Sequence, residues 1–403
     1  AKRTTRVRRA RTLPSRYMPS LLVPIPSPAR ASRAASLGSV ETRRVSRRVA
    51  RIASASSSSS DEISSRRRDR NPAATRLREL LAGPDIVQTP CAHDALSASL
   101  IERAGFKAGF MSGFCVSAAR LAMPDAGLIS YGEMADVGRT VCEAVSPGFP
   151  FIGDADDGYG NAMNAKRTTR GYAAAGFAGL LMEDQVAPKA CGHTRNRRVI
   201  PRADAVARVR AACDERDEGP NGDIVIFARS DSRSAESLEE ALWRVAAFAD
   251  AGADALFIDA LRSREEMEAF CKIAPGVPKM ANMLEGGGAT PICSPDELRD
   301  MGFKVVAYPL SLLMASTRAM ENTLRTIRDE GYPDESTLGT FEEIKDVIGF
   351  NAYYAEEARY DTTRAANANA AAAAGSGSTG GEAAYDAAFD ALCEDDPSAD
   401  ECK

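Results

Sequence analysis

The fold is decided by the stretch Ala178-Gly179-Leu180-Leu181-Met182-Glu183-Asp184-Gln185. Its first five residues are small or apolar without interruption, which is typical of a strand buried on both faces of a sheet. Charged residues follow at once, so the carboxyl end of that strand reaches a polar site. The loop behind it continues to Lys189-Ala190-Cys191-Gly192-His193. This loop adds an ammonium, a thiol and an imidazole to the two carboxylates.

Seven further runs of this kind lie between residues 75 and 332, and helical patterns separate them. Such alternation indicates a parallel sheet with crossover helices. Pairs such as Ala175-Gly176 and Ala251-Gly252 mark helix ends that turn into the next strand. Because eight is the strand number of a (β/α)8 TIM barrel, that α/β fold is our prediction. The expected strands are residues 85–89, 107–112, 150–156, 178–183, 223–229, 255–259, 278–282 and 304–308.

Polar residues gather at the carboxyl ends of these expected strands. In a (β/α)8 barrel those ends share one face, where active sites are built. Residues more than a hundred positions apart are therefore expected to converge on one site. They are Ser112, Gly113, Asp154, Asp156, Glu183, Arg229, Asp231, Asp259, Asn282 and Glu285.

One of these strand ends carries two carboxylates, Asp154 and Asp156, with glycines opening the loop behind them. Mg²⁺ prefers such hard oxygen ligands and needs only one or two protein carboxylates beside water and substrate. The sequence therefore predicts a Mg²⁺ site, which Mn²⁺ could also fill. Bound there, the metal would neutralise an enolate forming on a carboxylic acid. A surface turn rich in Asp and Gly is the alternative.

The loop and two other strand ends supply further candidate groups. Cys191, on a loop with the flexibility of a closing lid, could donate or remove a proton. Arg229 is a natural clamp for a carboxylate, and Ser112 with Gly113 offers a hydroxyl and backbone N–H groups. The alternatives are an inert buried thiol and a structural arginine ion pair. Zinc is disfavoured because the chain has only two His.

The charge of the chain is unevenly distributed. Residues 1–60 hold 14 Lys or Arg against one acid, Glu41, whereas the whole chain has a net charge of −5. The body is therefore acidic, and we expect no nucleic-acid partner. No window approaches the roughly 18 uninterrupted apolar residues of a membrane helix, so no membrane partner is expected either.

The terminal regions differ in composition from the body. The Arg- and Ser-rich start resembles an organelle transit peptide; a basic arm that binds nucleic acid or membrane is the alternative. Residues 340–354 have the pattern of one amphipathic helix, and an Ala-rich and then Gly/Ser-rich linker follows. The expected regions are 1–70 (disordered transit segment), 71–332 (barrel), 333–362 (C-terminal helices), 363–381 (flexible linker) and 382–403 (acidic tail).

The combined motifs resemble the isocitrate lyase and phosphoenolpyruvate mutase superfamily, in its petal-death and carboxyvinyl-carboxyphosphonate phosphorylmutase-like branch, which is similar to methylisocitrate lyase. The similarity covers about residues 76–360. It rests on Met111-Ser112-Gly113-Phe114, Leu121-Ala122-Met123-Pro124-Asp125, Gly153-Asp154-Ala155-Asp156, Glu183-Asp184-Gln185, Lys189-Ala190-Cys191-Gly192-His193, Ala228-Arg229-Ser230-Asp231 and Asn282-Met283-Leu284-Glu285-Gly286-Gly287.

The resemblance implies a homotetramer in which the last helix, residues 341–360, is swapped between subunits. It also implies roles for the site residues. Cys191 would protonate the enolate after carbon–carbon cleavage, where mutases tend to carry Asn, and Glu183 and Arg229 would orient substrate and thiol. The implied catalytic set is Cys191, Glu183, Arg229, Lys189 and His193. The implied substrate contacts are Ser112, Gly113, Phe114, Gly192, Asn282 and Glu285, and the implied Mg²⁺ residues are Asp154, Asp156 and, in the outer shell, Asp125.

Three positions depart from the superfamily pattern. Ala190 replaces a second basic residue of the loop, Asp259 stands where relatives usually have Glu, and His93 takes the place of a Tyr. The metal-site and thiol residues are all retained. We therefore expect a lyase that cleaves a 2-hydroxy or 2-oxo dicarboxylate: an alkylmalate, a methylisocitrate-like acid or oxaloacetate. The alternatives are a phosphonate-forming mutase and a barrel that has lost its chemistry and serves as a scaffold.

The last residues resemble a different protein. Cys393 and Cys402, with eight residues including a Pro between them and acids flanking them, are similar to the tail of the small chloroplast linker protein that joins glyceraldehyde-3-phosphate dehydrogenase to phosphoribulokinase. That resemblance implies a regulatory disulfide, opened by thioredoxin, and contact with the dehydrogenase. It also favours the chloroplast over the mitochondrion as the location. Two unrelated thiols on an acidic tail are the alternative.

Overall fold

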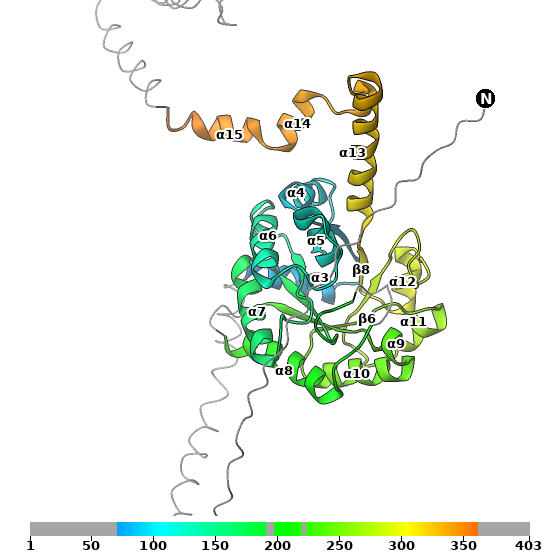
Figure 1. Cartoon of the computed structure of the whole chain (residues 1–403). Coiled ribbons are helices and arrows are strands. Elements are labelled where there is room, and N and C mark those ends of the chain that lie inside the picture. The colour runs from blue at the N-terminus through cyan, green and yellow to red at the C-terminus, as the bar shows by residue number, and fades with distance from the viewer. Residues whose placement is uncertain (1–70, 191–196, 220–222, 362–403) are drawn as a thin grey trace, which may run out of the picture. The chain divides into compact units, whose positions relative to one another are not determined.

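The structure is a computed structural model, and it describes residues 71–190, 197–219 and 223–361. Eight parallel strands close into a barrel in sequence order, β1 to β8, with β8 pairing back onto β1 (Figure 1). The (β/α)8 prediction is therefore confirmed. The strands are β1 (Val87–Ala92), β2 (Gly109–Met111), β3 (Phe151–Asp154), β4 (Gly179–Glu183), β5 (Val225–Ser230), β6 (Ala255–Ile258), β7 (Lys279–Asn282) and β8 (Val305–Tyr308).

All eight expected strands are present, with ends shifted by a few residues. The largest shift is in β1, which continues to Ala92 where residue 89 was the expected end. Pro90 lies within it, opposite Tyr308 of β8, and Cys91 and Ala92 pair with β2. Proline reads as a strand breaker in sequence because it has no N–H to donate. Here the pairing with β2 carries the strand past it.

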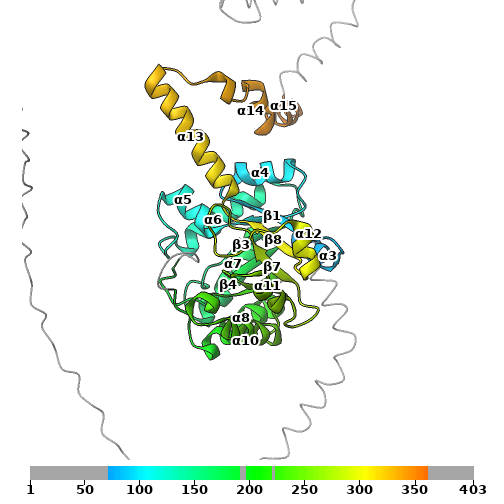
Figure 2. The same ribbon diagram turned by 90° about the vertical axis from the view of Figure 1, so that its right-hand side faces the viewer.

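Helices surround the strands (Figure 2). Side-chain caps that the sequence encodes begin several of them: the Asn161 side chain accepts from the N–H groups of Met163 and Asn164 at the start of α7. At the other end of α7, Gly176 has a φ of 101°, as its expected turn requires. The helices are α3 (Pro72–Ala82), α4 (Ala95–Arg103), α5 (Gly113–Leu121), α6 (Tyr131–Glu143), α7 (Ala162–Ala175), α8 (Arg202–Glu218), α9 (Ser232–Ala235), α10 (Leu238–Asp250), α11 (Arg264–Cys271), α12 (Pro295–Met301), α13 (Ser311–Glu330), α14 (Phe341–Val347) and α15 (Phe350–Glu357).

The residues inside the barrel set the direction of the site residues. Successive side chains of a strand point to opposite faces, so a residue two places beyond an inward one is inward too. Ile152, Leu181 and Phe227 belong to the buried cluster inside the barrel, which Leu77 of α3 also joins. This period places Asp154, Glu183 and Arg229 at the carboxyl end of the interior. Phe257 and Met280 also point inward, so the same two-residue period places Asp259 and Asn282 at the carboxyl end of the interior.

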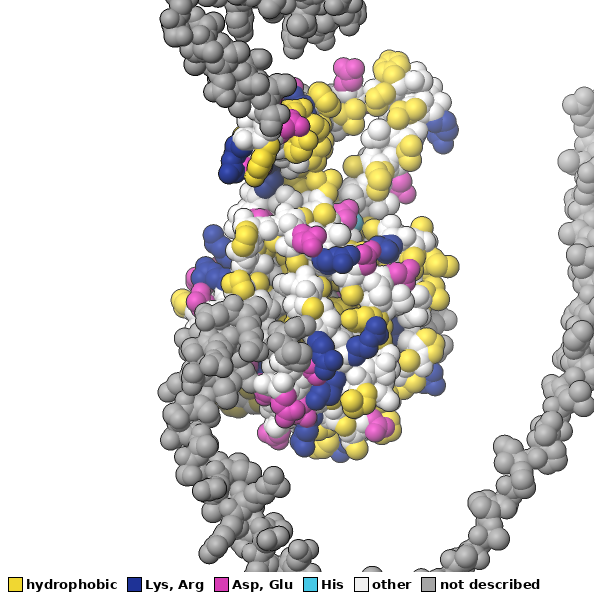
Figure 3. All heavy atoms as spheres, turned by 90° about the vertical axis from the view of Figure 1, so that its left-hand side faces the viewer, with side chains coloured by type: hydrophobic (Ala, Val, Ile, Leu, Met, Phe, Trp, Pro, Cys, Tyr) yellow, Lys and Arg dark blue, Asp and Glu magenta, His cyan; other side chains and the backbone are white. Residues whose placement is uncertain are grey.

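The C-terminal helices differ from the expectation. A single helix over residues 341–360 was wrong, because Gly349 adopts a φ of 84° and separates α14 from α15. None of α13, α14 and α15 has a buried residue within the described chain. Large apolar side chains stay exposed there, including Leu324 at 66% and Phe341 at 74%. Figure 3 shows hydrophobic side chains on these helices.

Several predictions concern residues outside the described ranges. These are the transit segment, the linker, the Cys393 and Cys402 pair, and the loop residues Cys191, Gly192 and His193. Among the helices that the structure describes, none is both long and apolar enough to cross a bilayer.

Candidate active site

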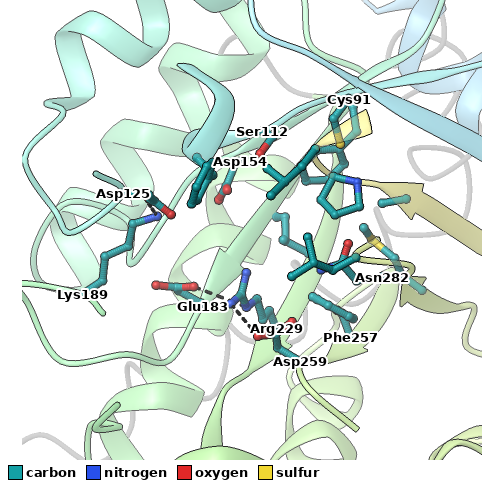
Figure 4. A pocket seen from close by; sticks show the side chains of 18 of the residues that line it. Cys91, Ser112, Asp125, Asp154, Glu183, Lys189, Arg229, Phe257, Asp259 and Asn282 are labelled. Carbon is teal, nitrogen blue, oxygen red and sulfur yellow. Dashed lines mark ion pairs between the residues drawn. The ribbon is translucent and has the colours of Figure 1, made fainter. Parts of the chain in front are cut away.

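A cavity of about 280 Å³ opens at the carboxyl end of the barrel strands (Figure 4). Both polar and apolar side chains line it. The polar lining is Ser112, Asp125, Asp154, Glu183, Gln185, Lys189, Arg229, Asp259 and Asn282. The apolar lining is Cys91, Phe110, Phe114, Leu181, Ala190, Phe257, Met280, Leu284, Ala307, Pro309 and Leu310.

The acidic corner of the cavity is built by β3 and the start of α5. The N–H of Gly113 donates to Asp154 Oδ2 over 3.1 Å, and the N–H of Asp156 donates to Oδ1 over 3.2 Å. A Cβ at Gly113 would lie 2.9 Å from that same Oδ2, so only glycine lets the helix start approach Asp154 this closely. Asp156 has a φ of 46°, a left-handed conformation that costs free energy and turns its carboxylate towards the corner.

Lys189 lies between two carboxylates in this corner. Its ammonium hydrogen-bonds to Asp156 and lies 2.8 Å from Asp125 Oδ1, although the side chain is almost fully buried. Burial alone would lower the pKa of Lys189, but the carboxylates of Asp156, Asp154 and Asp125 outweigh it and raise that pKa well above its usual value. Burial raises the pKa of Asp156 to about 7, against the opposing effect of Lys189.

The residues present fit a Mg²⁺ ion. Four acids and two bases line the cavity, so a bound anion needs further positive charge. Asp125 Oδ1 is buried, and the Lys189 ammonium is its ion-pair partner at 2.8 Å. No three or more His, Cys, Asp or Glu side chains of the described residues are grouped closely enough to hold an ion by themselves. The corner does offer carboxylate oxygens from Asp125, Asp154 and Asp156, and Mg²⁺ keeps several waters and needs only one or two protein carboxylates.

Opposite the acidic corner, Arg229 is held by three carboxylates. Its Nε and Nη2 each lie 2.9 Å from Asp231, Nε lies 3.3 Å from Glu183, and Nη2 lies 3.2 Å from Asp259. These contacts engage two of the three guanidinium nitrogens and leave Nη1 for a ligand in the cavity. A planar guanidinium fixed in this way is suited to binding a carboxylate.

Glu183 faces the cavity with an unused oxygen. Burial raises the pKa of Glu183 well above its usual value, and Arg229 opposes that shift. Its Oε1 has no hydrogen-bond partner among the described residues. A buried oxygen without a partner is unfavourable unless a ligand or water binds it. Glu183 is therefore placed to contact a bound molecule.

The structure brings most of the predicted site residues together. Ser112 caps α5, and Phe114 and Asn282 line the same cavity. Glu285 does not line it, since its carboxylate accepts a hydrogen bond from Ser311. His93 is also absent from the lining, and its Nδ1 is buried without a partner in the described chain.

Arg197 belongs to the site although no sequence pattern indicated it. This buried arginine pairs with Asp231 over 2.7 Å and with Asp259 over 2.9 Å, so two arginines share two aspartates. Asp259 thus belongs to the site although it is shorter than the expected Glu. No periodic pattern includes Arg197, because it lies in the irregular segment before α8. The apolar lining was not predicted either, because the sequence around Phe257 and Met280 indicates only buried strands.

Fold and site together define a class of protein: a (β/α)8 barrel with an acidic metal-type corner and an arginine clamp at the carboxyl ends of its strands. Residues 77–328 match the family model described as phosphoenolpyruvate phosphomutase, and the chain belongs to this family, within the phosphoenolpyruvate mutase/isocitrate lyase superfamily. Its homologues include enzymes, several of them lyases.

Three similar proteins illustrate the range of the family. The chloroplastic carboxyvinyl-carboxyphosphonate phosphorylmutase of Arabidopsis thaliana is 42% identical over 302 residues, which cover 73% of this chain and 87% of that protein. The 2,3-dimethylmalate lyase of Eubacterium barkeri is 38% identical, with 72% and 99% covered. A solved phosphonopyruvate hydrolase in complex with oxalate and Mg²⁺ has a TM-score of 0.63 and 30% identity, with 72% and 99% covered.

Proposed function

We propose that this protein is a Mg²⁺-dependent carbon–carbon lyase that cleaves a 2-hydroxy or 2-oxo dicarboxylate. The observation that carries the proposal is the opposition, across one cavity, of the acidic corner at Asp154 and the fixed guanidinium of Arg229. A dicarboxylate has an acid group for each side. The similarity to 2,3-dimethylmalate lyase over nearly its whole length supports a lyase.

The binding roles follow from the lining. Arg229 Nη1 and the amide of Asn282 bind one carboxylate, and Ser112 with the N-terminus of α5 binds the other. Asp154 and Asp156 hold the metal, with Asp125 beside them. When bound, Mg²⁺ supplies positive charge to the enolate oxygen that develops during cleavage. Glu183 holds the substrate's hydroxyl proton or a bound water through Oε1.

The proton for the cleaved product comes, in this proposal, from Cys191, which the sequence places two residues after Lys189. Cleavage of the bond leaves an enolate with its electron pair on carbon, and the thiol protonates that carbon. Cys191 lies outside the described residues, so this role rests on the sequence. The resemblance to lyases, which carry Cys at this place, supports it.

The apolar lining narrows the substrate class. Phe257, Met280, Leu284 and Pro309 offer no charge to a third carboxylate, whereas an alkyl branch would bury apolar surface there. Arg229 and Lys189 are the only cationic side chains among the described residues that line the cavity. An alkyl-substituted malate therefore fits better than a tricarboxylate.

The test is a panel of C4 to C7 hydroxy- and keto-diacids, incubated with the purified protein and Mg²⁺. We expect release of an α-keto acid from an alkylmalate, loss of all turnover with excess EDTA, and recovery when Mg²⁺ or Mn²⁺ is restored. Turnover that persists in EDTA would contradict the metal requirement. If no compound of the panel is cleaved, the alternative of a barrel that has lost its chemistry and serves as a scaffold is favoured.

A phosphonate-forming mutase is the second candidate, because the family model and the Arabidopsis relative carry mutase names. Phosphonopyruvate and phosphoenolpyruvate in the same panel distinguish it: interconversion without alkylmalate cleavage would establish the mutase.

Three predictions from the sequence remain proposals. A plastid location draws support from the chloroplastic relative. A homotetramer draws support from the exposed apolar helices. The redox tail at Cys393 and Cys402, with its thioredoxin and glyceraldehyde-3-phosphate dehydrogenase contacts, rests on sequence resemblance alone. A disulfide between the two thiols would block their alkylation, so alkylation of both after mild oxidation would contradict this proposal.

A further inference from the structure

The ammonium of Lys189 occupies the place where a cation is needed. It comes from the loop after β4 and hydrogen-bonds to Asp156, and it lies 2.8 Å from Asp125. Figure 4 shows the side chain directed at Asp125, on the side of the cavity where Asp154 lies. Only 8% of the residue is exposed, so it is built into the corner and does not rest on its surface.

Asp156 cannot serve Lys189 and a metal ion in the same way. Mg²⁺ binds carboxylate oxygens at about 2.0–2.1 Å, closer than an ammonium approaches its acceptor. Two cations on neighbouring oxygens of a buried corner also repel each other strongly, because little water lies between them to screen the charge. An ion held by Asp154 and Asp156, with Asp125 beside it, must therefore move the ammonium away.

We propose that Lys189 is an internal cation that neutralises the acidic corner in the metal-free protein and that a divalent ion displaces. In the described structure Lys189 makes its ion pairs only with Asp125 and Asp156. Once displaced, its ammonium remains within the same cavity. There it gives a second positive group, beside Arg229, to a dianionic substrate; this last consequence rests on the proposed function.

The first experiment measures divalent-ion binding without substrate. Mn²⁺ is titrated into the full chain, and free Mn²⁺ is followed by electron paramagnetic resonance. We expect Lys189→Met, which removes the competing charge, to lower the dissociation constant at least about tenfold. Lys189→Arg keeps the charge and should bind no more tightly than wild type. The matched control, Lys107→Met, removes an exposed charge ahead of β2 at the opposite end of the barrel and should leave affinity unchanged.

The second experiment uses the wild-type chain, so it decides the matter even if a variant does not fold. Lysines are acetylated under limiting reagent, and labelling at Lys189 is quantified by peptide mass spectrometry with and without Mg²⁺. We expect Lys189 to be protected without the metal and to react at least about fivefold faster with it. The labelling of Lys107 should not respond.

Two outcomes would overturn the proposal. Unchanged Mn²⁺ affinity in Lys189→Met would show that the ammonium does not compete. The second outcome is that Lys189→Met binds Mn²⁺ more tightly but acetylation of Lys189 in the wild type is the same with and without Mg²⁺. That result would show that the ammonium repels the ion from a distance and is not displaced by it. Neither measurement needs a substrate, so failure here is distinct from failure of the proposed lyase activity.

Discussion

At the scale of single residues, the two arginines show how a buried charge cluster can fix a clamp. Arg229 and Arg197 share Asp231 and Asp259, and Glu183 completes the set. Buried charges are tolerated when each is paired and hydrogen-bonded. The short side chain of Asp259 still reaches both guanidiniums, at 2.9 and 3.2 Å. The departure from Glu therefore leaves the clamp intact.

Cys191→Ser tests the proton donor. We expect turnover of the alkylmalate to fall at least about a hundredfold, because a hydroxyl is a much weaker acid than a thiol and general acid catalysis contributes roughly 10² to 10⁴ in rate. Substrate affinity, measured by isothermal titration calorimetry, should be retained. Turnover is measured by coupled detection of the α-keto acid.

Cys271→Ser is the matched control, since Cys271 ends α11 and does not line the cavity. It should keep the wild-type rate. A Cys191→Ser protein as fast as wild type would rule out the thiol as the acid.

At the scale of elements, an ionic network ties α10 and the segment before α8 to the carboxyl end of β4. Arg244 donates to Asp184 over 3.2 Å, to the carbonyl of Ile200 over 2.9 Å, and to Glu240 over 2.7 Å. Asp184 in turn accepts from Ser230 on β5. Because Asp184 follows Glu183 directly, this network fixes the strand end from behind the cavity.

Glu240→Gln tests the network through pH. Hydrogen bonding from Arg202, aided by Arg244 and opposed by burial, lowers the pKa of Glu240 to about 2. The ionised carboxylate therefore stabilises the fold above the unfolded pKa of about 4.3, and this contribution disappears as pH falls towards 2. Glu240→Gln should lower the free energy of unfolding at pH 7 by about 1.5–3 kcal/mol.

Urea unfolding at pH 7, 5 and 3.5 is the measurement, and the difference from wild type should shrink at the lowest pH. Glu321→Gln, at an exposed position of α13, should change stability by less than about 0.5 kcal/mol. A wild-type advantage that does not vary with pH would contradict the ionic explanation.

At the scale of the whole molecule, the apolar surface of α13 to α15 is unusual for a chain that acts alone. Met320, Leu324 and Ile327 share one side of α13 at helical spacing and are all exposed, as are Phe341 and Ile344 of α14. Contiguous apolar surface of this kind marks a protein interface. A second copy of the chain is the partner that the proposed homotetramer supplies.

Leu324→Glu tests that assembly. Burying an unpaired carboxylate in an apolar interface is costly, so we expect the variant to dissociate where the wild type is an oligomer. Light scattering after size-exclusion chromatography gives the mass. Asn322→Glu adds the same charge on the opposite side of α13 and should keep the wild-type mass. A wild-type chain that is monomeric at micromolar concentration would disprove the assembly.

The sequence by itself determined the barrel and the polar half of the site. Eight apolar runs indicate eight strands, and the two-residue period of a strand carries Ile152 to Asp154 and Phe227 to Arg229 at the same end of the interior. Closure of the barrel then brings those ends together. The apolar pattern does not reveal every break in the backbone: it continues across Gly349, whose left-handed conformation divides the predicted helix in two.

Only the tertiary structure decided which charges meet. Lys189 and Asp156 are 33 residues apart, and Arg197 and Asp259 are 62 apart. Each pair joins a loop residue, which no periodicity directs, to a strand end. The choice among carboxylates within reach depends on burial and on backbone conformation, such as the φ of 46° at Asp156. These are properties of the packed chain, because low-dielectric surroundings make each pairing strong and each unpaired charge costly.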